Sequence, residues 1–281
     1  MATLKKLRLS LIHPFYNDRP RLKVHTVAWK GYSKEALEAI DFVLVDDCSS
    51  KKELAIWCDF NRIKVPYIAI FRIMDDLKWN TPGALNLGVL QSTTDWVLFM
   101  DSDCLMLPED VERLINFEPD PNTTYFFPRN RICTDERIRN AKADRFLPCA
   151  ILIHKDLFIR AGGFDEDFTG ARSGGYAHFD NDFVTRVLEI GERRIMDGTA
   201  GNNGRHRVPE DTKVQPRVVI QEYMEDVVGS NVQTITGTTE KNILINKRLW
   251  YAKIRGEVPR NREHLRFNWK CRFDRRKRRK T

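Results

Sequence analysis

Short apolar runs alternate with segments of more mixed composition along the first half of this chain. Runs of consecutive apolar residues are typical of strands buried on both faces of a sheet. They predict strands at Leu7–Ile12, Phe42–Val45, Val65–Phe71 and Asp95–Met100. The segments between and after them predict helices at Arg19–Lys30, Lys51–Asn61, Ala84–Leu90 and Pro108–Phe117. This order predicts an α/β fold, with a mostly parallel sheet flanked by helices on both faces.

Capping residues mark where two of these helices start. Ser50 can cap the helix Lys51–Asn61 through its hydroxyl oxygen. Thr81 can be the N-cap of the next helix, because Pro82 then takes the favoured first helical position.

The second half of the chain has a different pattern. Cys149–His154 is predicted to be a strand, and the short helix Lys155–Ala161 follows it. The segment from Phe168 to Tyr176 is rich in glycine and polar residues, which predicts a mobile loop across a site. Apolar positions at helical spacing predict a further helix over Phe183–Ile190.

Asp180-Asn181-Asp182 opens this last helix. Carboxylates at the start of a helix are favoured by the helix dipole, and this structural explanation is sufficient by itself. A catalytic carboxylate at the rim of a cleft is the alternative. The pattern leaves both interpretations open.

Asp101-Ser102-Asp103 follows directly on the apolar run Trp96–Met100. In open α/β sheets, ligands bind at the carboxyl ends of the strands. Carboxylate oxygens are ligands for Mg²⁺ or Mn²⁺, and Mg²⁺ is commonly bound by one or two carboxylates together with substrate phosphates. The motif therefore predicts a divalent metal site that holds a phosphate-bearing substrate.

The positive charge of the chain is concentrated near its C-terminus. The net charge is +8 over 281 residues, but residues 247–281 carry +12 and the remainder carries −4. We therefore expect one α/β domain over residues 1–246 and a basic extension over residues 247–281. The block at residues 275–280 is expected to be disordered and solvated, and it could contact nucleic acid, an anionic membrane or an acidic polymer.

Cysteine spacing and hydropathy bear on the compartment. The six cysteines form no Cys-x-x-Cys pair, which favours a reduced, intracellular protein, and we expect a cytoplasmic location. No apolar segment is long enough to span a bilayer, so no transmembrane segment is expected. The apolar stretch Leu9–Phe15 is interrupted by polar residues and reads as a strand, not as a signal peptide.

Six short motifs occur in an order that is familiar from one family. They are Pro14–Arg19, Val45–Ser49, Asn80–Gly88, Asp101–Asp103, Gly162–Glu166 and Phe179–Phe183. With them, the segment from Leu9 to Arg207 resembles glycosyltransferases of the large inverting family 2 type, which have the GT-A (Rossmann-like) fold. The second half also resembles the galactosyltransferase-type carboxyl region, which includes His206.

The resemblance implies a binding site for a nucleotide sugar. The loop after the first strand would supply Pro14, Tyr16 and Arg19, and the acid after the second strand would be Asp46 or Asp47. A carboxylate can accept from base N–H groups and from ribose hydroxyls, and arginine can pair with a phosphate. The same resemblance places three further residues at the donor, namely Asn86, Ser102 and Gly163.

The resemblance also implies a metal and a base. Asp101 and Asp103 would bind Mn²⁺ or Mg²⁺, with His206 as the third ligand; a surface histidine is the alternative for His206. Asp180 matches the general base of the family, which takes the proton of the acceptor hydroxyl. Asp182 is the second candidate and could instead orient the acceptor or cap the helix. The family often has glutamate before the base, where this chain has Phe179.

The metal motif and the resemblance together predict a metal-dependent glycosyltransferase that uses a nucleoside-diphosphate sugar, with a UDP-sugar favoured. The resemblance implies that the transfer is inverting. The acceptor would be a hydroxyl of a glycan, a lipid-linked molecule or a protein. A sugar nucleotidyltransferase shares the fold and the metal, but its first loop is generally rich in glycine, and residues 13–19 contain none. A polyanion-binding protein that acts through the basic tail is the non-enzymatic alternative.

Overall fold

The computed structural model describes residues 6–50, 65–132, 150–175, 177–196, 216–223, 240–261 and 263–276. The helix predicted at Lys51–Asn61 lies outside these residues, as does His206.

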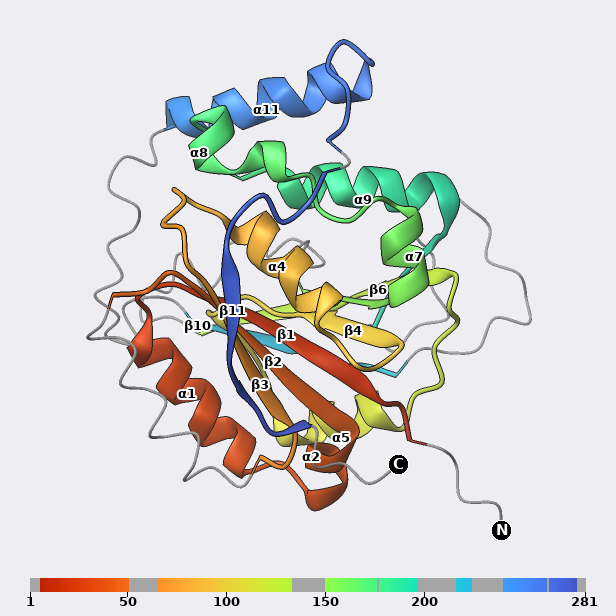
Figure 1. Cartoon of the computed structure of the whole chain (residues 1–281). Coiled ribbons are helices and arrows are strands. Elements are labelled where there is room, and N and C mark those ends of the chain that lie inside the picture. The colour runs from red at the N-terminus through yellow and green to blue at the C-terminus, as the bar shows by residue number, and fades with distance from the viewer. Residues whose placement is uncertain are drawn as a thin grey trace, which may run out of the picture.

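Among the described residues, eight strands form a central sheet in the order β11-β3-β2-β1-β4-β8-β6-β9 (Figure 1). The strands are β1 (Leu9–Phe15), β2 (Ile40–Asp47), β3 (Ile68–Ile73), β4 (Trp96–Phe99), β6 (Thr123–Phe126), β8 (Ile151–His154), β9 (Glu192–Ile195) and β11 (Trp269–Asp274). The inner strands β3, β2, β1 and β4 are parallel, whereas β8 and β11 run antiparallel to their neighbours. A smaller sheet pairs β5 (Cys104–Met106), β10 (Ile220–Tyr223) and β7 (Arg129–Ile132). The predicted α/β fold with a mostly parallel sheet is confirmed.

Both faces of the sheet are covered by helices (Figure 1). One face carries α1 (Arg19–Lys30), α2 (Lys34–Ala39) and α5 (Pro108–Ile115). The other face carries α4 (Thr81–Leu90), α7 (Lys155–Arg160) and α9 (Phe179–Ile190). Along each inner strand, successive side chains enter opposite cores; Leu44 packs on the first face and Val45 on the second. This double burial explains why these strands are uninterrupted apolar runs.

Helix α4 lies between the sheet and an outer layer of chain. Every residue from Pro82 to Val89 is buried, as expected of a helix that is covered on all sides. Its N-cap is Asn80 and not the predicted Thr81, so Thr81 is the first helical residue. Gly88 lies against Ile12 of β1, and a Cβ at this position would overlap the Ile12 side chain.

The glycine-rich segment predicted as a mobile loop contains a short helix instead. A 3₁₀ turn over Glu166–Phe168 leads into α8 (Gly170–Ser173), and Gly174 ends α8 with a left-handed conformation. Phe168 and Thr169 are buried. The prediction failed because buried partners from distant parts of the chain hold this segment; Asn246 is one of them.

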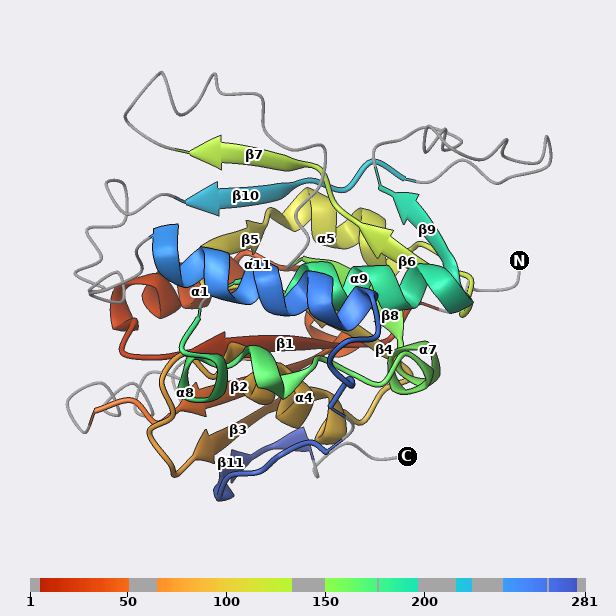
Figure 2. The ribbon, with the colours of Figure 1, turned by 90° about the horizontal axis from the view of Figure 1, so that it is seen from above.

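The C-terminal residues contribute one helix to the outer layer and one strand to the central sheet. Helix α11 (Glu240–Ile254) lies along α8 and α9 and runs across the expected boundary between residues 246 and 247 (Figure 2). After it, β11 pairs with β3 and forms the edge of the central sheet.

The block at residues 275–280 was expected to be solvated, and this was wrong for Arg275 and Arg276. Arg275 N–H donates to the Ile68 carbonyl at 2.9 Å, and the Arg276 guanidinium pairs with Asp274 at 3.1 Å. Neutralisation by Asp274 and packing over an aromatic ring allow Arg276 to be buried. Residues 277–281 lie outside the described part.

In the described part of the chain, no helix has the length and apolarity needed to cross a bilayer. Three cysteines of this part are not in disulfide bonds, namely Cys48, Cys104 and Cys271.

Candidate active site

The carboxyl ends of β1, β2 and β4 meet at one edge of the sheet. Figure 2 shows β1, β2 and β3 pointing toward the side where α8 and the start of α11 lie. The loops after β1 and β2 are joined by two hydrogen bonds: Asn17 N–H donates to Ser49 Oγ at 2.9 Å, and Ser50 N–H donates to Asn17 Oδ1 at 2.7 Å. The predicted donor residues at the ends of these strands are therefore held on one edge.

Asp46 and Asp47 are adjacent but have different surroundings. Asp46 is fully buried, pairs with Arg72 at 2.7 Å and accepts from Ser49 N–H at 2.8 Å. Asp47 accepts a longer bond of 3.3 Å from Asn80 Nδ2. Burial and the nearby charges of Asp46 and Asp76 raise the pKa of Asp47 to about 7, although bonds from Asn80 oppose the shift. The structure gives Asp46 a role within the protein, and Asp47 is the better candidate to meet a ligand.

Asp101-Ser102-Asp103 forms a tight turn after β4, in which Cys104 N–H donates to the Asp101 carbonyl at 3.0 Å. Helix α1 holds this turn at Ser102. His25 Nε2 lies 2.8 Å from the Ser102 carbonyl, and Ser102 Oγ donates to Asp18 Oδ2 at 3.4 Å. Burial lowers the pKa of His25 to about 4, so the ring is neutral, and its Nε2–H must be the donor because a carbonyl only accepts.

The two carboxylates of this turn suit Mg²⁺ or Mn²⁺ in their donor chemistry. Both Asp101 and Asp103 are partly exposed, and phosphate oxygens would complete a coordination shell of the kind that Mg²⁺ prefers. Within the described ranges, no group of three or more His, Cys, Asp or Glu residues could hold a metal ion. The expected third ligand, His206, lies outside those ranges and stays a prediction.

Three residues were predicted to contact the donor from a loop after the first strand. Pro14 belongs to β1, where it pairs with Val45 in the register of the sheet. Tyr16 is 44% exposed, and its hydroxyl donates to Asp76 Oδ1 at 3.3 Å. Arg19 is the first residue of α1, and its Nε is buried without a hydrogen-bond partner among the described residues. A guanidinium beside a helix N-terminus is suited to an anionic group.

Asp180 lies in the first turn of α9, in the helical layer on the second face of the sheet. Its neighbour Phe179 contacts Trp79 at a ring distance of 5.5 Å, and Trp79 precedes Asn80, the partner of Asp47. Burial raises the pKa of Asp180, against opposing backbone hydrogen bonds. A raised pKa makes a carboxylate a stronger base, which suits it to accept a proton from an acceptor hydroxyl.

Asp182 is fully buried in an ion pair and does not lie open to a ligand. Its Oδ2 accepts from Arg186 Nε at 2.8 Å, one turn further along α9, and Arg260 lies 3.8 Å from its Oδ1. Of the two predicted catalytic carboxylates, the geometry therefore favours Asp180.

Asn86 and Gly163 do not lie with the carboxylates. Asn86 Nδ2 donates to the Phe164 carbonyl and its Oδ1 accepts from Phe164 N–H, both at 2.9 Å. Gly163 has a positive φ of 62° after α7, and a Cβ there would lie 3.1 Å from Asn86 Oδ1.

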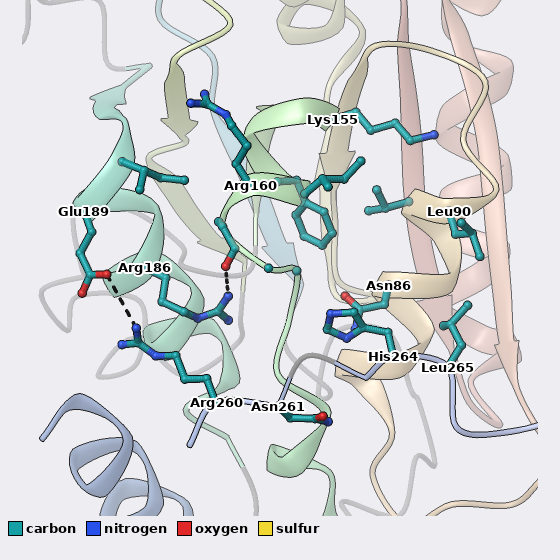
Figure 3. Close-up of a pocket in the computed structure, with 17 residues that line it drawn as sticks. Asn86, Leu90, Lys155, Arg160, Arg186, Glu189, Arg260, Asn261, His264 and Leu265 are labelled. Carbon is teal, nitrogen blue, oxygen red and sulfur yellow. Dashed lines mark hydrogen bonds and ion pairs between the residues drawn. The ribbon is translucent and has the colours of Figure 1, made fainter. Parts of the chain in front are cut away.

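Both residues line a cavity of about 710 Å³ between α4, α7, α9 and four residues that follow α11, which Figure 3 shows. These four are Arg260, Asn261, His264 and Leu265. None of Asp47, Asp101, Asp103 and Asp180 lines this cavity. The structure thus places Asn86 and Gly163 at this cavity, which the four carboxylates do not line.

Sequence reasoning missed the residues that hold this edge together. Asp18 and His25 steady the turn at Ser102, and Arg72 neutralises Asp46. A signal was present for Asp18, because an aspartate followed by Arg-Pro at a helix start is a typical N-cap. No local pattern marks the other two.

A parallel sheet with a carboxylate turn at its carboxyl edge is the architecture of GT-A proteins. The chain belongs to glycosyl transferase family 2, whose family description matches residues 10–187.

Comparisons with individual proteins agree with the family. An uncharacterized glycosyltransferase of Haemophilus influenzae is 23% identical over 200 residues, which are 64% of this chain and 62% of the relative. Mannosyltransferase PcManGT from Pyrobaculum calidifontis, solved with GDP-Man and Mn²⁺, matches with a TM-score of 0.52 and 18% identity. The match covers 78% of this chain and 57% of PcManGT. TarS 1–349 of S. aureus, solved with UDP-GlcNAc, matches with a TM-score of 0.58 and 13% identity, over 91% of this chain and 68% of TarS.

The two structures show that the fold is shared. This chain spans less than two thirds of the length of the Haemophilus relative and of PcManGT.

Proposed function

We propose that this protein is a metal-dependent, inverting glycosyltransferase that moves a sugar from a nucleoside-diphosphate sugar to an acceptor hydroxyl. One observation supports this most strongly. In a chain of family 2, Asp47 ends β2 and the Asp101–Asp103 turn follows β4, and these two strands flank β1. Asp180 lies in the first turn of α9, next to Phe179, whose ring contacts Trp79.

The donor would lie across the ends of β1, β2 and β4. Asp47 would accept hydrogen bonds from the base or the ribose, and Tyr16 would border the nucleoside. Arg19 would pair with the diphosphate, because its Nε is buried without a hydrogen-bond partner among the described residues. We propose a UDP-sugar as the donor, supported by the structural neighbour TarS, which was solved with UDP-GlcNAc. GDP-sugars are also to be tested, because the neighbour PcManGT was solved with GDP-Man.

Asp101 and Asp103 would hold Mn²⁺ or Mg²⁺, which when bound neutralises the charge that develops on the diphosphate leaving group. The residues around them keep their geometry fixed. His25 and Asp18 restrain Ser102 from helix α1, so both carboxylates are presented from a preorganised turn. His206 remains our proposal for a third ligand.

Asp180 would act as the general base. The acceptor oxygen attacks the anomeric carbon from the face opposite the nucleotide, and its proton moves to a carboxylate oxygen of Asp180. The new bond joins the anomeric carbon to the acceptor oxygen. The bond from that carbon to the diphosphate oxygen breaks, and the nucleoside diphosphate leaves with the electron pair. This single displacement inverts the configuration.

Donor binding tests this function without knowledge of the acceptor. Thermal unfolding is measured with a panel of UDP- and GDP-sugars, each with and without Mn²⁺. A ligand that binds the native state raises the melting temperature. We expect at least one donor to raise it in the presence of metal and much less in its absence. A panel that gives no shift would overturn the proposal.

A further inference from the structure

We infer that the C-terminal helix α11 positions Asp180, and that Asn246 is the residue through which it does so. The inference rests on the proposed role of Asp180 as the base. It adds a positioning residue from beyond residue 187, where the family match ends.

The backbone just before Asp180 has an unusual conformation. Ala177 and His178 both have positive φ angles, of 66° and 67°. Residues with a Cβ rarely adopt this left-handed conformation, and two in succession persist only where the surroundings hold them. The turn they make leads directly into α9, where Asp182 N–H donates to the His178 carbonyl at 3.1 Å. The direction in which the Asp180 side chain points from α9 therefore depends on this turn.

Asn246 supplies a constraint on this turn. The residue is fully buried, and its Nδ2 donates to the Ala177 carbonyl at 2.9 Å and to the Phe168 carbonyl at 3.0 Å. Its two donors thus join the start of the glycine-rich segment to the turn that precedes Asp180. Its Oδ1 is buried without a hydrogen-bond partner in the described part of the chain. The amide therefore acts here through its two donors.

Two other residues of the same helix face fix α11 in place. Trp250 stacks on the His178 ring at 5.7 Å and 13°. Lys253 has a fully buried side chain and lies 2.8 Å from both Asp165 and Asp167. Positions four and seven residues after Asn246 share its face of an α-helix. Lys253 holds α11 to the segment that contains Asp165 and Asp167, whereas Asn246 and Trp250 contact the turn at residues 177–178.

These separate contacts allow two Asn246 variants to be compared with one control variant at Lys253. Asn246→Ala removes both donors to the turn, and Asn246→Ser keeps one hydroxyl donor. Lys253→Met removes a buried polar anchor on the same face without touching Ala177 or His178. A displacement of about 1 Å at a reacting group can cost about a hundredfold in rate. We therefore expect a turnover defect from the Asn246 variants that exceeds the defect from Lys253→Met.

The first measurement needs no substrate. Hydrogen exchange of the full chain is followed by mass spectrometry in peptides that cover residues 177–183. Asn246→Ala should speed exchange there at least tenfold, Asn246→Ser should lie between, and Lys253→Met should leave this peptide unchanged while exchange near residues 165–168 rises. Equal exchange at residues 177–183 in wild type and both Asn246 variants would overturn the inference.

The second measurement separates positioning from stability. Release of UDP from UDP-GlcNAc with Mn²⁺ gives kcat and the donor KM, and the pKa of the Asp180 carboxyl is followed by ¹³C NMR. Asn246→Ala should lower kcat by about 10- to 100-fold, keep the donor KM within about twofold, and move the pKa of Asp180; Asn246→Ser should recover part of each change. An unchanged Asp180 pKa in both Asn246 variants would overturn the inference, whatever the turnover.

The two hypotheses fail in different ways. If Asp180→Asn keeps wild-type turnover, the proposed function is wrong. If Asp180→Asn is inactive while Asn246→Ala keeps wild-type kcat and wild-type exchange at residues 177–183, the proposed function stands and the positioning role is wrong.

Discussion

Arg72 and Asp46 form a buried ion pair at the carboxyl ends of the adjacent strands β3 and β2, with 2.7 Å between Nη1 and Oδ2. Arg72 Nη2 also donates to the Ser49 carbonyl at 2.8 Å, and Asp46 accepts from Ser49 N–H. The pair therefore fixes the loop that follows β2. Asp47, the next residue, is presented from this fixed backbone.

Removal of Arg72 should destabilise the protein strongly. Arg72→Leu leaves a fully buried carboxylate without its counter-charge, and breaking a buried pair in this way costs about 3–5 kcal/mol. Urea unfolding at neutral pH should show a loss of that size. Arg72→Lys, which keeps the charge but not the fork of two donors, should lose less. A loss below about 1 kcal/mol in Arg72→Leu would contradict the role given to this pair.

Asp47 should make stability depend on pH. Its pKa in the folded protein is raised from 3.8 to about 7, so the native state binds more protons than the unfolded state between these values. Unfolding free energy should therefore fall as pH rises from about 4 to about 7, and stay low above that. Asp47→Asn removes this effect and should be more stable than wild type at pH 8, by on the order of 1–4 kcal/mol.

Melting curves from pH 4 to pH 8 check this prediction. The two proteins should converge toward pH 4 and diverge as the pH rises. Parallel curves over the whole range would show that the Asp47 carboxyl is not perturbed by its surroundings.

Asp182 should matter for stability more than for the chemical step. Asp182→Asn weakens its buried ion pair with Arg186, and the free energy of unfolding should fall by about 3 kcal/mol. Asp180→Asn, in contrast, should change stability little and reduce turnover by orders of magnitude. Chemical unfolding and UDP release measured on both variants test the assignment. A large loss of turnover in Asp182→Asn, with near-wild-type turnover in Asp180→Asn, would assign the base to Asp182.

Close packing of α4 on the sheet predicts an overpacking effect at Gly88. A Cβ added there overlaps Cγ2 of Ile12 on β1, and both residues lie in the core. Gly88→Ala should destabilise by about 1–3 kcal/mol, although alanine in a helix interior is otherwise favourable. In an Ile12→Ala background the same change should cost much less, which a double-mutant cycle measures. An equal cost in both backgrounds would contradict this contact.

The inner sheet could be predicted from the sequence because each strand is buried on both faces. An apolar run such as Phe42–Val45 has no polar face to confuse with a helix or a surface strand, and β2 contains it. The direction of β8 could not be predicted, since strand pattern alone does not distinguish its antiparallel pairing with β4. The edge strand β11 was hidden because Lys270 and Arg272 interrupt its short sequence, and only some of its residues face the core.

The candidate site could be predicted where a motif coincides with the end of a strand. Asp101 and Asp103 follow β4 in this way, and their carboxylates are suited to the expected chemistry. Asp46, Asp182 and Asn86 also belong to motifs, but tertiary partners occupy their polar atoms. Those partners lie far away along the chain or one helical turn later. A single sequence does not indicate which carboxylate of a motif pairs with such a partner and which stays available to a ligand.

The measurement that tests the account most directly compares Asp101→Ala with Asp180→Asn in two assays. The first is the rise in melting temperature on adding a nucleotide sugar with Mn²⁺, and the second is release of the nucleoside diphosphate. We predict that Asp101→Ala loses both, whereas Asp180→Asn keeps the donor-dependent rise and loses turnover. Wild-type turnover in either variant, or loss of the donor-dependent rise in Asp180→Asn with retention in Asp101→Ala, would contradict a donor site at the Asp101–Asp103 turn with Asp180 as its base.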